Sequence, residues 1–86
     1  MYLHIGQSVV IPSHSIVGIF DLDNATQSHL TRRFLEQAER EGRLKSIGEE
    51  LPKSFIVCRV KDETQIYFSQ ISSATLLRRA EENGIE

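Results

Sequence analysis

The chain has 86 residues, of which 40% are hydrophobic, and its formal net charge at pH 7 is −2. This length fits one small domain, residues 1–86, and the slight negative charge argues against general nucleic-acid binding. The single cysteine, Cys58, excludes an intramolecular disulfide, and no apolar run approaches the ~20 residues of a membrane span. Residues 1–4 also lack the basic and apolar regions of a signal peptide, so a soluble, cytoplasmic protein without membrane contact is expected.

Three short strands are predicted in the first quarter of the chain. Residues 2–5 and 8–11 are short strand candidates, the second stopped by Pro12, with a plausible tight turn at Gly6 and Gln7 between them. Residues 15–22 are almost continuously apolar, which is typical of a strand covered on both faces. One cover would be a helix and the other a neighbouring subunit. Gly18 in the middle of this strand indicates a bulge or a close backbone approach.

The longest helical pattern extends from Asn24 to Leu44. One apolar face is predicted from residues at helical spacing, namely Leu30, Thr31, Phe34, Leu35 and Ala38. Three residues are competent to begin the helix, namely Asn24, Thr26 and Ser28. Gly42 is placed as a C-terminal cap, and the exposed face offers Glu36–Arg40 and Glu39–Arg43 pairs. This helix should lie across a sheet built from both halves of the chain.

The second half of the chain predicts a hairpin followed by a short helix. Residues 45–52 have the composition of a loop, and residues 54–60 form a strand with Phe55 and Val57 opposite Ile56 and Cys58. Residues 65–71 return as a strand, and a helix capped by Ser72 or Ser73 continues to a cap at Asn83–Gly84. The predicted order is βββαββα, an α+β domain with two helices against a sheet.

Residues that could carry chemistry are few and scattered. The three histidines, His4, His14 and His29, have no ligand spacing, so no metal site is expected. Cys58 has no signature of a nucleophile around it and is interpreted as a buried strand residue. Asp21 and Asp23 could form an acid–base pair, but turn and capping roles favour these residues there. No enzyme, no cofactor and no small-molecule ligand is therefore expected.

Basic residues gather in the middle third of the chain. Residues 32–61 contain eight Lys and Arg against five Asp and Glu, whereas residues 1–31 contain no Lys or Arg. In a helix Arg32 has Glu36 at i+4, while Arg33 has Gln37 and is freer to contact phosphate. A solvated surface and a phosphate-binding surface both remain open on charge alone.

The sequence resembles a known bacterial family. The segments Tyr2-Leu-His-Ile-Gly6, Ser15-Ile-Val-Gly-Ile-Phe-Asp21, Phe34-Leu35 and Ser69 through Arg79 resemble the extracellular matrix regulators, the RemA/RemB family, and within it the B branch. The likeness covers nearly the whole chain. It implies a LytTR-like DNA-binding fold and a bacterial, cytoplasmic transcription regulator. It further implies a homo-oligomer, as in the ring of the A branch, which binds promoter DNA and promotes biofilm matrix gene expression.

The resemblance also implies which residues would contact the phosphate backbone of double-stranded DNA. Arg32 and Arg33 match a Lys-Arg pair of the A branch, and Lys53 is the one basic residue left where that branch has an arginine-rich stretch. His14 stands where the A branch has an arginine. Two functions remain open: a homo-oligomeric DNA-binding regulator, and an oligomeric protein-interaction module with weak or no DNA binding. In both, the apolar strands exceed what two short helices cover, which predicts that the protein is not a monomer.

Overall fold

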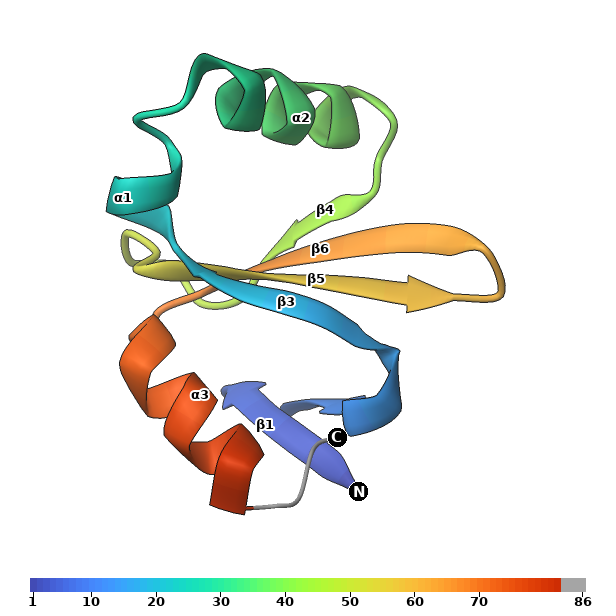
Figure 1. Ribbon diagram of the computed structural model, residues 1–86, viewed down its shortest axis with the longest axis vertical. Coiled ribbons are helices and arrows are strands. Elements are labelled where there is room, and N and C mark those ends of the chain that lie inside the picture. Colours follow the sequence, from blue (N-terminus) through green and yellow to red (C-terminus); the bar gives the residue numbers. More distant parts are fainter. Residues whose placement is uncertain (83–86) are drawn as a thin grey trace.

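The chain folds around a four-stranded sheet in a computed structural model that describes residues 1–82 (Figure 1). Its elements in order are β1 (Tyr2–Gly6), β2 (Val9–Pro12), the 3₁₀ turn η1 (Ser13–Ser15), β3 (Ile16–Asp21), α1 (Leu22–Ala25), α2 (His29–Arg40), β4 (Leu44–Ser46), β5 (Ser54–Val60), β6 (Glu63–Ser69) and α3 (Ser73–Glu82). The α+β class is confirmed. The predicted order missed β4 and treated α1 and α2 as one helix, and the predicted cap at Asn83–Gly84 lies outside the described residues.

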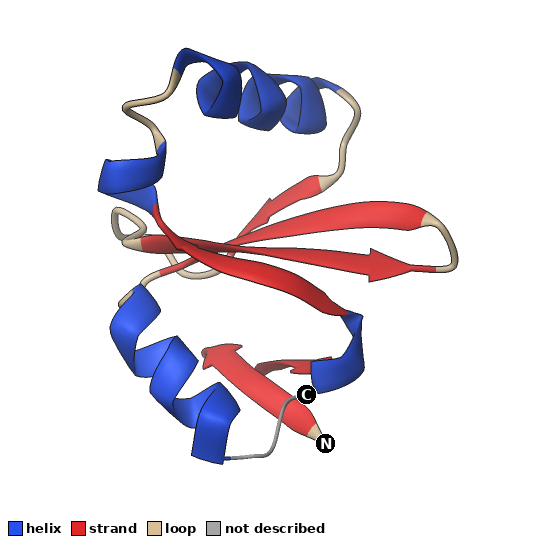
Figure 2. Ribbon diagram, in the orientation of Figure 1, coloured by secondary structure: helices blue, strands red, loops and turns tan. Residues whose placement is uncertain are grey.

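The main sheet joins both halves of the chain, as the sequence predicted. Its strand order is β3-β5-β6-β4, with antiparallel pairs except for the parallel pair of β4 and β6. The helices α1 and α2 lie over one face, and α3 lies over the other together with the β1–β2 hairpin (Figures 1 and 2). The molecule thus has three layers, with the sheet in the middle.

The predicted alternation of the C-terminal hairpin is confirmed. Phe55 and Val57 of β5 face α2 and pack in one cluster with Ile66 of β6. Ile56 and Cys58 face the opposite layer and belong to the second cluster. The two strands join through Lys61 and Asp62, whose φ values of 51° and 67° are those of a tight type I′ turn.

Strand β3 has the irregularity that Gly18 predicted. Its register against β5 shifts between Ile16 and Gly18, which leaves a bulge at Val17. A Cβ at Gly18 would come within 2.7 Å of the Phe20 ring, so the ring lies directly over the glycine. The Phe20 ring also stacks on Phe55, with centroids 5.0 Å apart.

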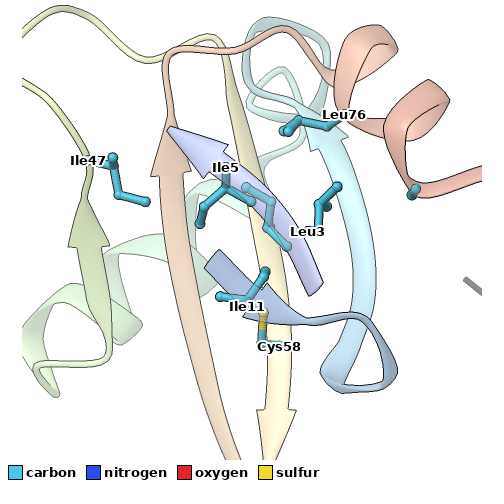
Figure 3. Packing of buried hydrophobic residues seen from close by; sticks show 8 residues of the cluster. Leu3, Ile5, Ile11, Ile47, Cys58 and Leu76 are labelled. Atoms are coloured by element: carbon cyan, nitrogen blue, oxygen red, sulfur yellow. The ribbon is translucent and has the colours of Figure 1, made fainter. Parts of the chain in front are cut away.

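The second face of the sheet is covered by the chain itself, not by a neighbouring subunit as the sequence suggested. Leu3 and Ile5 of β1, Ile11 of β2 and Leu76 of α3 are buried against the sheet (Figure 3). The Ser69 hydroxyl donates a 2.6 Å hydrogen bond to the Ile5 carbonyl and so ties the hairpin to β6. The sequence predicted the two strands of this hairpin but not that they pack on the main sheet, because a strand pattern does not show which other element covers it.

Helix α2 is rotated relative to the predicted face. Leu35 and Ala38 are buried and Thr31 is half-buried, but Leu30 is 76% exposed and Phe34 is 41% exposed. The helix also begins later than Asn24, because Ser28 is its N-cap and accepts from the Thr31 N–H. A separate short helix, α1, precedes it and is capped by Asp21, so the capping interpretation of that carboxylate is confirmed.

The C-terminal end of α2 matches the prediction at Gly42. This glycine has φ of +74°, and the Arg43 N–H donates back to the Ala38 carbonyl at 2.9 Å, as in a Schellman motif. The predicted Glu36–Arg40 and Glu39–Arg43 pairs do not form; within residues 1–82 Arg43 pairs with Glu41 instead. Helix α2 ends at Arg40, so Arg43 lies beyond it and the helical i,i+4 spacing from Glu39 does not apply.

The segment predicted as a loop after α2 starts with strand β4. Leu44, Lys45 and Ser46 pair in parallel with Ile66, Tyr67 and Phe68 of β6. Three residues of mixed polarity carry no strand pattern, so only the tertiary pairing defines this element. No helix within residues 1–82 is long and apolar enough to cross a membrane.

Candidate functional site

Helix α2 presents Arg32 and Arg33 to solvent. Both side chains are exposed, and Arg33 precedes the buried Leu35 by two residues, which places it about 200° around the helix and away from the sheet. Neither arginine has a carboxylate within 4.0 Å among the described residues. The competing Arg32–Glu36 contact that the spacing allows is therefore not formed, and both guanidinium groups are available to an anionic partner.

Lys53 occupies a fixed position at one end of the sheet. Its N–H donates to the Ser69 carbonyl at 2.8 Å, and its carbonyl accepts from the Leu22 N–H at 3.0 Å. The preceding loop is also tied down, because the Gln70 side chain donates to the Glu50 carbonyl at 3.2 Å. An exposed lysine on such a fixed backbone loses less conformational freedom on binding than one on a mobile loop.

Lys53 and His14 lie at opposite ends of strand β3. Leu22, which bonds to Lys53, begins the α1 segment that leads into the N-terminal turn of α2 (Figure 1). His14 is exposed in η1 and precedes β3, at the other end of that strand. A six-residue strand spans about 20 Å at ~3.3 Å per residue. A single contact surface on one subunit therefore does not include His14 together with Lys53.

The basic middle of the chain is divided between the two ends of the sheet, a separation that the sequence did not show. At the end away from Lys53, Arg43 donates to the Thr64 carbonyl at 3.4 Å, and Thr64 pairs with Arg59 in the hairpin. Lys61 lies in the adjoining turn. The residues were visible in the sequence, but the parallel pairing of β4 that brings Arg43 to the hairpin was not.

Carboxylates accompany both basic groups. Asp21 and Asp23 flank the start of α1, and Glu49 and Glu50 lie in the loop before Lys53. At the other end, Glu41 accepts from Gln37 and Arg43, and these two contacts hold the pKa of its exposed carboxyl below the usual value. Any anionic ligand at either end must therefore approach basic side chains that have acidic neighbours, which makes binding sensitive to geometry as well as to charge.

Cys58 has the environment of a structural residue. It is buried in β5, and burial raises the pKa of its thiol, with a smaller opposing contribution from Ser15. A raised pKa lowers the thiolate fraction, and the thiolate is the reactive form. The interpretation of Cys58 as a buried strand cysteine is confirmed.

We expect the Cys58 thiol to react with an aromatic disulfide reagent at pH 8 at least ~100-fold more slowly in the folded protein than in urea, since reaction requires opening of the core. The release of the coloured thiolate, followed with and without urea, measures both rates. A folded-state rate equal to that of the unfolded chain would contradict the burial of this residue.

The comparisons with known proteins agree with one another. Residues 2–80 match the family described as RemA-like, extracellular matrix regulatory protein A-like. The chain is also 36% identical over 81 residues to extracellular matrix regulatory protein B of Bacillus subtilis (strain 168). That alignment covers 94% of this chain and 91% of the relative, so it extends over the sheet and both layers that cover it.

Proposed function

This chain belongs to the RemA-like family of extracellular matrix regulatory proteins, and from this premise we propose that it is a homo-oligomeric, DNA-binding regulator of matrix genes. The names of the family and of the relative are those of regulators of the extracellular matrix. We propose that the regulated genes serve biofilm formation and that the protein acts on double-stranded DNA in a bacterial cytoplasm.

The observation that carries the DNA-binding part is that two exposed cations, Arg33 and Lys53, form no ion pair within residues 1–82. Arg33 projects from the first turns of α2, and Lys53 projects from a backbone held by two hydrogen bonds. Both can contact phosphate without first breaking an ion pair within residues 1–82. Oligomerisation multiplies such contacts, which compensates for the small number on one subunit. Arg32 adds a third exposed cation on α2, and His14 would contact DNA only from a different part of the assembly.

The direct test is a titration of a matrix-gene promoter fragment and an unrelated fragment of equal length over a salt series. We expect binding of both fragments that weakens steeply as salt rises, because each phosphate contact adds about −0.9 to the slope of log affinity against log salt. Tighter binding to the promoter fragment would show sequence selectivity in addition. Absence of binding to either fragment even at low salt would contradict DNA binding.

The carboxylates beside Lys53 favour a second candidate, an oligomeric protein-interaction module with weak or no DNA affinity. Glu49 and Glu50 lie in the loop that precedes Lys53, and Gln70 holds the Glu50 backbone of that loop. Negative side chains next to phosphate repel it. An oligomer that fails the salt-series titration but retains a defined mass would support this second function.

A further inference from the structure

An apolar groove lies between α2 and strand β3, the last strand on its side of the main sheet. It has a volume of about 370 Å³ and is lined by Val17 and Phe20 of β3 and by Leu30 and Phe34 of α2. Phe55 of β5, which is buried and stacked on Phe20, also lines it. Seven of the eight lining residues have apolar side chains, so displacing water from this groove is favourable for an apolar occupant.

The size of the groove fits a small molecule better than a folded protein. Small-molecule pockets have volumes of about 300–1,000 Å³ and are lined mainly by apolar and aromatic side chains. A stable protein interface takes about 20–30 residues from each partner, whereas eight residues line this groove. Thr31 is the one residue with a polar side chain among them, so the part of a ligand that enters the groove must be hydrocarbon.

Arg33 provides a cation beside the groove. It follows Leu30 by three residues and precedes Phe34 by one, which places it about 60° from Leu30 around α2, on the side that faces solvent. Its exposed side chain forms no ion pair in the described part of the chain, and a long arginine side chain can lie along apolar surface while its charge stays in water. On β3, the carboxylate of Asp21 already accepts from the Asn24 N–H at 3.0 Å. The cation without a partner favours an anionic head group over a cationic one.

We propose that this groove binds a free fatty acid of medium length, with its alkyl chain between Phe20 and Phe34 and its carboxylate on Arg33. The chain covers apolar side chains that are otherwise exposed to water, since Phe20 is 42% and Phe34 is 41% exposed. The guanidinium group offers a carboxylate charge-assisted hydrogen bonds. This ligand goes beyond the proposed regulation of matrix genes, and its test needs no DNA.

The first test measures the binding of hexanoate, octanoate and decanoate to the wild-type protein by NMR, below the concentrations at which they form micelles. We expect saturable shifts of the side-chain resonances of Val17, Leu30 and Phe34. The affinity should rise about fourfold with each added methylene until the groove is full, because burial of a methylene contributes about that factor. The resonances of Leu77, which lies on α3 on the other face of the sheet, should not shift.

Two variants separate the role of the alkyl chain from that of the head group. Leu30→Gln removes an apolar side chain from the groove, and Leu51→Gln is the matched control at a leucine that is 90% exposed and does not line it. We expect Leu30→Gln to weaken octanoate binding at least about fivefold and Leu51→Gln to leave it unchanged. Arg33→Gln should weaken octanoate binding about two- to fivefold at low salt but leave octanol binding unchanged, because only octanoate carries a charge. Circular dichroism checks the fold of each variant.

Four results would overturn the proposal. These are an affinity that does not rise with chain length, shifts at Leu77 as large as those at Val17, equal losses for Leu30→Gln and Leu51→Gln, and equal losses of octanoate and octanol in Arg33→Gln. Absence of saturable binding would also overturn it, including the case in which a second copy or another protein covers the groove. The salt-series titration tests DNA binding independently of all these outcomes.

Discussion

Replacing Ile56 with alanine is expected to lower the free energy of unfolding by about 2–5 kcal/mol. Ile56 is fully buried in β5, a central strand, and belongs to the cluster that joins the sheet to β1, β2 and α3. Truncation removes buried methyl groups and leaves a cavity that the strand cannot close. Since a domain of this size is stable by about 5–15 kcal/mol, this loss is a large part of the total. Urea unfolding followed by circular dichroism measures it.

Two matched variants calibrate this prediction. Ile56→Val removes one methyl group at the same position and should cost only about 0.5–1.5 kcal/mol. Val60→Ala lies in the same strand, but its side chain is 50% exposed, so it should cost less than Ile56→Ala. The measurements need a protein concentration at which the chain is monomeric, because association raises apparent stability. Equal costs for Ile56→Ala and Val60→Ala would contradict the assignment of Ile56 to the core.

Period-two patterns in the sequence predicted β5 and β6 well. In β5 the alternation of Phe55 and Val57 with Ile56 and Cys58 matches the two covered faces. Only one register fits such a pattern, because a shift by one residue would move every side chain of the strand to the opposite face of the sheet. Glycines were similarly informative: Gly18 marks the bulge in β3, and Gly42 has the positive φ of a helix terminus.

Helical patterns were less decisive for α2. A stripe that contains both Leu30–Phe34 and Leu35–Ala38 spans more of the helix than one sheet contact can bury. The structure buries the second pair and leaves the first exposed beside β3. The exposed Leu30 and Phe34 line a groove of about 370 Å³ with Phe20 of β3, a feature that the sequence did not predict.

The candidate site was predicted only in part. Sequence identified Arg33 and Lys53 as exposed cations, and both side chains are exposed in the structure. The grouping of His14 with them came from the resemblance alone, and the length of β3 separates it. Distances across a sheet follow from strand pairing, and the positions of residues in the sequence do not show which strands pair. Binding by any of the three stays a prediction.

Charge reversal of both cations, Arg33→Glu with Lys53→Glu, is expected to have the largest effect on DNA affinity. Phosphate contacts position a protein without reading sequence, so binding to promoter and unrelated fragments should weaken by about the same factor. Removing one phosphate contact should lower the salt slope by about 0.9, and the effect multiplies in a complex that engages several subunits. The fold should survive, because exposed charge changes usually cost under ~0.5 kcal/mol.

The matched control reverses Arg78, which is exposed on α3 on the other side of the sheet. Arg78→Glu makes the same change in charge per residue, so it corrects for the general effect of a more negative protein. We expect the Arg33 and Lys53 variants to weaken binding much more than Arg78→Glu at equal salt. Each single variant should show part of the effect, and Lys53→Gln should weaken binding less than Lys53→Glu because it removes a cation without adding repulsion.

Equal affinities and salt slopes for the double variant, Arg78→Glu and the wild type would mean that DNA binds elsewhere. The hairpin group of Arg43, Arg59 and Lys61 would then be the next surface to reverse, because it is the other place where pairing of strands brings cations together. Within that group Arg59 and Lys61 are exposed, whereas Arg43 already pairs with Glu41. Reversal of Arg59 and Lys61 should therefore weaken binding at this surface more than reversal of Arg43, whose charge is partly neutralised before any phosphate arrives.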